Sequence, residues 1–306
     1  VKITVNPSPI VIFTPTTQAI CSGGTSALVT LNSNTPGATF NWTATQPLGI
    51  TEAIQTTGTN TIPAQTFTNT TNTDISVVYK AEATVAGGSA CSGAVYTYTI
   101  TVKPTPSITT PLAKTICSAT SFSITPSNGL GNIVPTGTLY TWSTAVFSPS
   151  GAITGGVAQN SPQASISQTL TNTTEQTATA TYMVTPIAGT CSGTPFQVVI
   201  TVNPSPKVTF SGSNQTICTG STSSPINLSS STTGNVTYSW TASAPLGITG
   251  IQTSGTDVIP AQTLTNSTTN PITVVYTATA TVNTNGVSCS GSAFEYKITV
   301  NPSIIT

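Results

Sequence analysis

The chain has 306 residues, of which only 4% are charged, and its formal net charge is zero. It contains no histidine, which excludes histidine-based catalytic triads and metal sites, and it lacks a basic stripe that would bind nucleic acid. No apolar run reaches the roughly 18 residues that a membrane-spanning helix needs. We therefore expect a chain that is not an enzyme, with no catalytic residues, no cofactor, no metal, no nucleic-acid partner and no direct membrane insertion.

A repeat of about 98 residues organises the chain. Ile-Thr-Val follows each of three Cys-Ser-Gly triplets at the same distance, and the triplets begin at Cys91, Cys191 and Cys289. A fixed spacing indicates a fixed hairpin, whose second strand ends at Asn-Pro or Lys-Pro because proline cannot donate to a β ladder. Ile3 heads one more copy of this strand. We therefore expect the chain to be an excerpt of a longer array.

In the first repeat, short alternating stretches predict strands at 10–13, 27–31, 38–43, 62–68, 75–84 and 95–102. In 75–84, Val77 and Tyr79 share one face, whereas Lys80 and Glu82 share the other and mark solvent. About seven short strands per repeat, with Trp42 between two cysteines, are typical of an immunoglobulin-like sandwich. The expected fold class is all-β, with tandem β-sandwiches in an elongated array.

The other two repeats keep this framework to different degrees. In the third repeat, 238–242, 259–266 and 274–280 match strands of the first. The second repeat differs between Trp142 and Ser165, where another sequence replaces the Pro-Leu-Gly-Ile loop of the first. Divergence confined to a loop is what a β-sandwich tolerates best.

The six cysteines divide into two per repeat, and we predict one structural disulfide inside each repeat: Cys21 with Cys91, Cys117 with Cys191, and Cys218 with Cys289. Six cysteines allow about 15 pairings, and a repeated pair is most simply explained by a repeated bridge. Reduced buried thiols are the alternative, and metal ligation is weaker because no Cys-x-x-Cys or histidine accompanies a pair. Disulfides imply an oxidising, extracytoplasmic location.

Three further features each allow two interpretations. Trp42, Trp142 and Trp240 could stack on sugar rings, but one tryptophan per repeat on a strand favours core packing. The Thr-x-Thr runs could form a hydroxyl surface for a glycan or ice, but solvated strand faces are the more common cause. Seven Asn-x-Ser/Thr triplets would matter in a eukaryotic secretory pathway, and we interpret them as chance in a chain rich in Asn and Thr. The triplets begin at Asn41, Asn69, Asn172, Asn214, Asn227, Asn235 and Asn266.

Six segments follow one another in this order: Trp-Thr-Ala, Pro-Leu-Gly-Ile-Thr, Ile-Pro-Ala-Gln-Thr-Leu-Thr-Asn, Val-Val-Tyr-Thr-Ala-Thr, Cys-Ser-Gly and Ile-Thr-Val-Asn-Pro. This combination resembles the PKD-like repeats of giant cell-surface adhesins in Bacteroidota. The resemblance implies a PKD-type β-sandwich, export by the type IX secretion system, and display as a filament that the gliding motor moves along the cell. The Trp-Asp-Phe-Gly-Asp-Gly segment of typical PKD domains is absent. An acidic, ion-related role of that segment therefore does not carry over.

We predict PKD/Ig-like repeats at 8–103, 104–203 and 204–301, with 1–7 ending a preceding repeat and 302–306 starting a following one. The expected function is a structural segment of an extracellular, outer-membrane-attached adhesin filament that transmits force in cell attachment and gliding motility. Its expected partners are neighbouring repeats, with surface polysaccharide and gliding-machinery or outer-membrane proteins as further candidates. The alternatives are a glycan-binding array, through loops 47–51 and 245–249, and a passive spacer in a large secreted protein.

Overall fold

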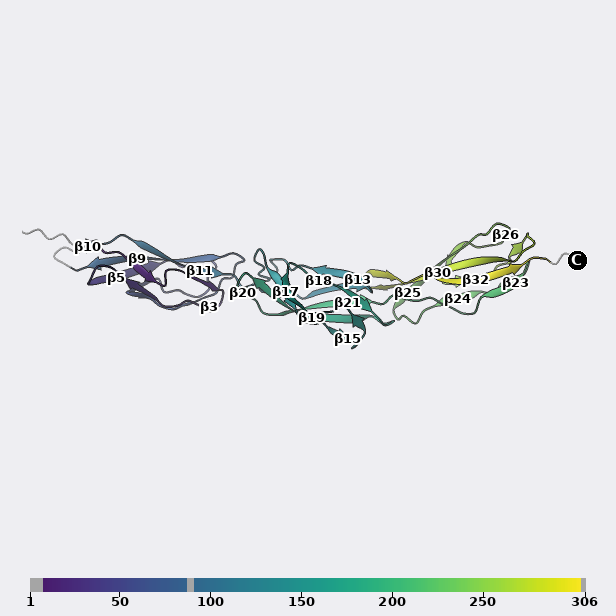
Figure 1. Cartoon of the computed structure of the whole chain (residues 1–306), viewed down its shortest axis with the longest axis horizontal. Coiled ribbons are helices and arrows are strands. Elements are labelled where there is room, and N and C mark those ends of the chain that lie inside the picture. The colour runs from purple at the N-terminus through teal and green to yellow at the C-terminus, as the bar shows by residue number, and fades with distance from the viewer. Residues whose placement is uncertain (1–7, 87–90, 304–306) are drawn as a thin grey trace, which may run out of the picture.

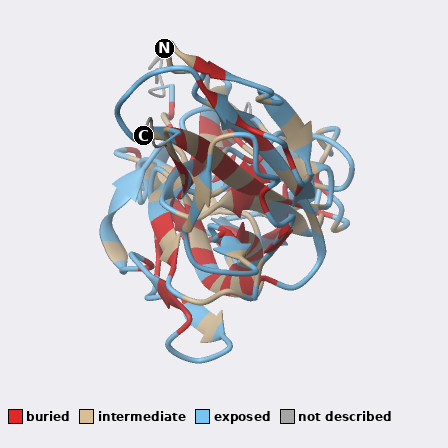
Figure 2. Cartoon of the chain, turned by 90° about the vertical axis from the view of Figure 1, so that its right-hand side faces the viewer, coloured by how far each residue is buried: buried red, intermediate tan, exposed pale blue. Residues whose placement is uncertain are grey.

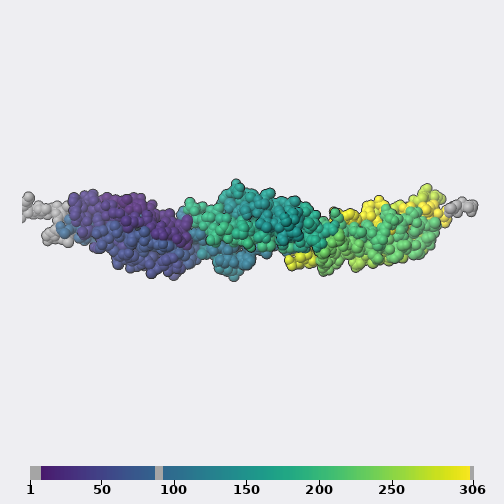
Figure 3. Space-filling view, turned by 90° about the horizontal axis from the view of Figure 1, so that it is seen from below, coloured from purple at the N-terminus to yellow at the C-terminus, as the bar shows by residue number. Residues whose placement is uncertain are grey.

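The structure, a computed structural model, describes residues 8–86 and 91–303, and throughout these ranges the regular secondary structure consists of β-strands alone. Three modules follow one another along the long axis of an elongated molecule (Figure 1). The first module contains β1–β11, the second β12–β21 and the third β22–β32, and every sheet lies within one module. The space-filling view shows a rod (Figure 3). The expected all-β class is confirmed. The predicted piece 1–7, and residues 304–306 of the predicted piece 302–306, lie outside the described residues.

The first module pairs a large sheet, in the order β2-β11-β9-β5-β6 with β10 beside β9, with a small sheet β1-β4-β7 and the pair β3-β8. Its strands are β1 Ile12–Thr14, β2 Gln18–Cys21, β3 Gly24–Thr25, β4 Val29–Asn32, β5 Ala38–Ala44, β6 Thr57–Thr59, β7 Thr61–Ile62, β8 Thr66–Phe67, β9 Ile75–Val85, β10 Cys91–Ser92 and β11 Tyr96–Lys103. The predicted strand 62–68 is broken into β7 and β8, so the module has more and shorter strands than expected.

The second module has the sheet β12-β21-β19-β14-β17, with β15 and β20 also on β19, and the sheet β13-β18-β16. The first of these sheets differs from the large sheet of the first module, because both β14 and β15 pair with β19. The strands are β12 Leu112–Cys117, β13 Thr120–Ile124, β14 Leu139–Trp142, β15 Val146–Ser148, β16 Ile153–Thr154, β17 Gln159–Gln163, β18 Ile166–Asn172, β19 Ala178–Ala188, β20 Cys191–Ser192 and β21 Phe196–Asn203.

The third module repeats the first, with the sheet β23-β32-β30-β25-β27, β31 beside β30, the sheet β22-β24-β28 and the pair β26-β29. Its strands are β22 Thr209–Phe210, β23 Gln215–Cys218, β24 Ile226–Ser229, β25 Asn235–Ala242, β26 Ile248–Thr249, β27 Ser254–Thr256, β28 Val258–Ile259, β29 Thr265–Asn266, β30 Ile272–Thr284, β31 Val287–Ser290 and β32 Phe294–Asn301.

Each module has its own hydrophobic core between its sheets. The alternation in β9 works as its sequence predicts, because Val77 and Tyr79 are fully buried whereas Lys80 is exposed. Seen end-on, buried residues occupy the middle of the molecule and exposed ones its periphery (Figure 2). Three separate cores mean that the modules need some other connection to hold a fixed arrangement.

The last strand of every module pairs in parallel with a strand from the beginning of the same module. β11 lies beside β2, with Lys103 level with Cys21. The same pairing joins β21 to β12 and β32 to β23. Because the two strands run in the same direction, the first cysteine of a module reaches the end at which the chain leaves that module.

Candidate functional site at the module junctions

The two cysteines of one module lie at opposite ends of its last strand. We call Cys21, Cys117 and Cys218 the first cysteines, and Cys91, Cys191 and Cys289 the hairpin cysteines. In the second module Cys117 is level with Asn203, the last residue of β21, while Cys191 belongs to the hairpin that precedes β21. A strand of this length spans about 26 Å, far beyond the roughly 5.5 Å between Cα atoms that a disulfide requires.

The disulfides therefore connect different modules. Cys21 of the first module is bonded to Cys191 of the second, with 5.5 Å between their Cα atoms. Cys117 of the second module is bonded to Cys289 of the third, with 5.4 Å between their Cα atoms. The predicted bridges within modules, Cys117 to Cys191 and Cys218 to Cys289, are wrong. Cys117 is bonded to Cys289 and Cys191 to Cys21, which leaves Cys218 without its predicted partner.

The remaining two cysteines are Cys218 and Cys91. Cys218, at the end of β23, is a free and exposed thiol. The predicted bridge from Cys21 to Cys91 is also wrong, because Cys21 is bonded to Cys191. The backbone of Cys91 pairs with Val85 in the hairpin, and its side chain lies outside what the structure describes.

Polar contacts surround the disulfide at the second junction. The side-chain amide of Asn203 donates to the carbonyl oxygen of Val287 at 3.5 Å and lies 3.7 Å from the Cys289 sulfur. Asn203 is completely buried, and its side-chain oxygen has no hydrogen-bond partner. Asn285 of the third module donates to the Thr115 hydroxyl at 3.4 Å. The hairpin of one module thus sits on the end of the module before it.

The linker explains the glycine in each Cys-Ser-Gly triplet. A Cβ atom on Gly291 would lie 1.6 Å from the carbonyl oxygen of Pro206, and one on Gly193 would lie 1.9 Å from that of Pro106. These distances are far below van der Waals contact. Only glycine lets the linker backbone cross the hairpin so closely, and this crossing aligns the hairpin cysteine with the preceding module.

A buried asparagine fixes the end of each module that carries the first cysteine. The Asn69 amide donates to the carbonyl oxygens of Thr73 at 2.7 Å and Val102 at 2.9 Å. Its side-chain oxygen accepts from the backbone and the hydroxyl of Thr71, at 2.8 and 2.7 Å. The backbone N–H of Asn69 donates to the hydroxyl of Ser22, the residue after Cys21. All four hydrogen-bonding positions of the side chain are used.

The same network recurs around Asn172 and Asn266, including the contact to Ser118 or Thr219 next to the first cysteine. Since the threonine two positions later completes the network, the Asn-x-Thr triplet is structural at these three sites. Its interpretation as chance is wrong there. The signal was the return of the triplet at one place in every repeat.

The three tryptophans predicted as core residues do not contribute to an exposed surface. Trp42, Trp142 and Trp240 are all buried within the cores of their modules. The indole N–H of Trp42 donates to the carbonyl oxygen of Thr61 at 2.8 Å, and that of Trp240 to the carbonyl oxygen of Val258 at 3.0 Å. These rings have no face available for stacking on a sugar.

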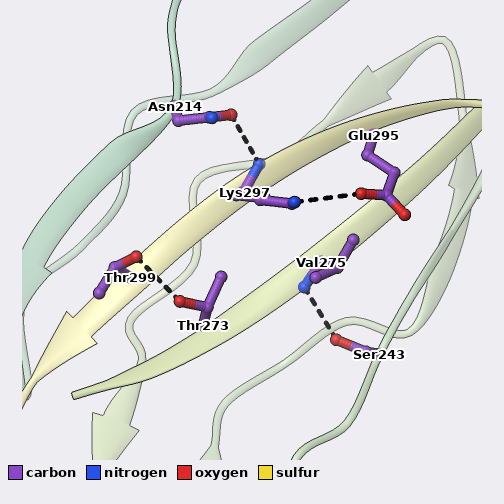
Figure 4. A network of polar contacts seen from close by, with 7 residues as sticks. All are labelled: Asn214, Ser243, Thr273, Val275, Glu295, Lys297 and Thr299. Carbon is purple, nitrogen blue, oxygen red and sulfur yellow. Dashed lines mark hydrogen bonds and ion pairs between the residues drawn. The ribbon is translucent and has the colours of Figure 1, made fainter.

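In the described part of the chain no cluster of metal-ligating side chains occurs. Lys297 forms an exposed ion pair with Glu295 at 3.2 Å, and its backbone N–H donates to Asn214 (Figure 4). Glu52 accepts a hydrogen bond from the Thr68 backbone at 2.6 Å, and hydrogen bonding to Thr68 lowers the pKa of the Glu52 carboxyl. Such contacts organise loops and strands.

Comparison with known sequences and structures identifies the family. A family model described as "PKD-like domain" matches residues 18–106, 114–206 and 215–304. The chain belongs to the PKD-like domain family. No curated protein sequence matches this chain. No helix long and apolar enough to cross a membrane occurs in the part of this PKD-like chain that the structure describes.

Solved structures of multidomain proteins are similar to this PKD-like chain. A three-domain immunoglobulin fragment of titin has 8% sequence identity and a TM-score of 0.42, covering 97% of this chain and 100% of that one. The EC21-23 fragment of human CDH23 has 13% identity and a TM-score of 0.39, covering 96% and 100%. Immunoglobulin domains 1–5 of Sidekick-1 have 11% identity and a TM-score of 0.37, covering 97% and 60%.

Proposed function

We propose that this chain is a force-bearing segment of a long extracellular filament, in which disulfides lock consecutive PKD-like modules to each other. The pair of bridges Cys21–Cys191 and Cys117–Cys289 carries the proposal. Each bridge runs beside the peptide linker, so each junction is crossed by two covalent connections. Two separate connections resist bending and twisting that a single flexible linker would allow.

The bridges also change the route that tension takes through the chain. They interleave, because Cys117 lies between Cys21 and Cys191, and Cys191 lies between Cys117 and Cys289. The shortest covalent route from end to end runs to Cys21, crosses to Cys191, returns to Cys117 and crosses to Cys289. Only about 110 residues lie on this route, which limits its length to roughly 400 Å, against about 1,100 Å for the reduced chain.

Pulling single molecules by their two ends tests the mechanical proposal. With both disulfides intact, complete unfolding should stop near 400 Å; after reduction it should continue to about 1,100 Å. The double variant Cys21→Ser and Cys117→Ser, pulled without reductant, should behave like the reduced chain. Equal final lengths with and without reductant would contradict the proposal.

The finer assignment is a gliding-motility adhesin of the SprB type, exported by the type IX secretion system of a Bacteroidota cell. Its support is the repeat sequence that ends each module in Cys-Ser-Gly and Ile-Thr-Val-Asn-Pro. Disulfides support an extracellular location, since they persist in oxidising compartments. Antibody labelling of intact cells should detect the protein on the surface and lose it when type IX secretion is disabled. Labelling that requires permeabilised cells would contradict the assignment.

A second candidate function is an array that binds a surface ligand through loops 47–51 and 245–249. One observation favours it: Leu48 and Leu246, at equivalent positions in the two loops, are 98% and 97% exposed. Binding of the chain to a polysaccharide array, lost in the double variant Leu48→Ser and Leu246→Ser, would support it. Unchanged binding in that variant would exclude these loops.

A further inference from the structure

The end of the second module shows what a completed junction looks like. Ile116, next to Cys117, is buried, and Asn203 is completely buried under the hairpin of the third module. Cys117 is bonded to Cys289 in that hairpin. The surface formed by the first cysteine, the residue before it and the last residue of the final strand therefore receives a Cys-Ser-Gly hairpin.

The third module carries the same surface in the same register. Cys218 lies level with Asn301, just as Cys117 lies level with Asn203. The backbone N–H of Thr219 donates to the Asn301 carbonyl oxygen at 2.9 Å, matching the bond from Ser118 to Asn203. Asn266 holds Thr219 and the end of β32 through the network described above. This end is therefore preorganised by the interactions that shape the two completed junctions.

Within residues 8–86 and 91–303, no hairpin covers the third-module surface. Cys218 is an exposed free thiol, and Ile217 and Asn301 are half-buried, whereas Ile116 and Asn203 at the second junction are buried. At the first junction the corresponding Ile20 and Lys103 are half-buried, while Cys21 is bonded to the hairpin. The free thiol is thus one part of a larger surface whose counterpart at the second junction is covered by a hairpin. Two equivalent cysteines of the same chain, Cys21 and Cys117, already form the bond that this surface lacks.

We propose that the end of the third module is a binding site for the Cys-Ser-Gly hairpin of a further copy of this repeat, which Cys218 joins by a disulfide. The matching hairpin in a second copy of this chain is that of Cys91. Its backbone pairing with Val85 corresponds to the pairings of Cys191 with Ala188 and Cys289 with Val282. Docking extends the array head to tail.

The bond can form by exchange with a small disulfide such as oxidised glutathione. The Cys218 thiolate attacks that disulfide, forms a mixed disulfide and releases one glutathione thiolate. The Cys91 thiolate of the incoming hairpin then attacks the Cys218 sulfur of the mixed disulfide and releases the second glutathione. Two protein thiols are oxidised while one glutathione disulfide is reduced to two thiols. This inference needs only the junction geometry and does not depend on the adhesin assignment.

Complementary variants of the full chain provide the test. Cys91→Ser retains Cys218, and Cys218→Ser retains Cys91, so only their mixture can form the proposed bond. In a glutathione redox buffer at about 1 mM protein, comparable to the effective concentration of tethered modules, the mixture should form disulfide-linked dimers. Peptide mass mapping should find Cys218 joined to Cys91, with each variant alone at least ten-fold less dimeric. The unchanged chain should form longer head-to-tail multimers.

A displaced thiol serves as the matched control. The control chain carries Cys91→Ser, Cys218→Ser and Ser221→Cys, which leaves a thiol at 221, three residues from position 218, since Ser221 is exposed. Mixed with Cys218→Ser, which retains Cys91, this control chain should not form disulfide-linked dimers. Dimers of Cys91→Ser alone through Cys218–Cys218, equal linkage by the displaced thiol, or only monomers with glutathione on Cys218 would each overturn the proposal.

Discussion

Cys21 and Cys191 are separated by 170 residues in the chain, yet their Cα atoms lie 5.5 Å apart across the junction between the first two modules. The parallel pairing of β2 with β11 brings Cys21 to that junction. The linker, crossing Gly193, brings the hairpin of Cys191 to the same place. The bridge is therefore a property of two modules and their linker together.

Removing this bridge should loosen one junction and leave the other intact. In the double variant Cys21→Ser and Cys191→Ser, the first module loses the closure of a loop of roughly 80 residues to its folded neighbour, which the chain-entropy model values at about 4 to 5 kcal/mol. Thermal unfolding should show a less stable first module. Small-angle scattering should show bending at the first junction only. A scattering profile identical to that of the unchanged chain would mean that the linker alone fixes the angle.

The buried asparagine network should contribute substantially to module stability. Asn69→Ala removes the hydrogen bonds that the Asn69 amide donates to the carbonyl oxygens of Thr73 and Val102. The free energy of unfolding should fall by about 3 kcal/mol. Asn41→Ala is the matched control, because Asn41 also begins an Asn-x-Thr triplet but is exposed, and its substitution should cost below about 0.5 kcal/mol. Urea unfolding of both variants measures the difference. If Asn69→Ala lowered the free energy of unfolding as little as Asn41→Ala does, the network would be energetically unimportant.

Gly291→Ala should disturb the second junction, because the added Cβ would lie 1.6 Å from the Pro206 carbonyl oxygen. The linker must move, and we expect a loss of at least about 2 kcal/mol and a lower yield of the Cys117–Cys289 bond. In Gly212→Ala the new Cβ meets no atom within 4 Å, so this control should be nearly neutral. Peptide mapping under non-reducing conditions measures the bond. A full yield of the bond in Gly291→Ala would contradict the close crossing.

The buried tyrosines should make the modules sensitive to alkali. Burial raises the pKa of Tyr79 to about 12, above its ordinary value of 10.0. Because the folded state holds this proton more tightly than the unfolded state, the stabilisation is complete below pH 10 and is lost as pH rises from 10 towards 12. The free energy of unfolding, measured between pH 8 and 12, should fall in that window. Tyr79→Phe should reduce the slope, and an unchanged slope would assign the effect to other groups.

Much of the fold could be predicted from the sequence because it depends on local alternation. The faces of β9 follow from the period of two along the strand, and Trp42 lies in the core beside Tyr79, with ring centroids 5.4 Å apart. The prediction of one continuous strand at 62–68 is wrong. There the chain divides between two small sheets as β7 and β8, a division that depends on neighbours distant in the sequence.

The sequence by itself determined the repeat, the all-β class and the regular placement of two cysteines in each module, because these depend on spacing and alternation along the chain. Only the tertiary structure decided which cysteines meet. Parallel pairing of the last strand with an early one sends Cys117 to one end of the second module and leaves Cys191 at the other. A disulfide forms only where Cα atoms come within about 6 Å, and that proximity arises between modules.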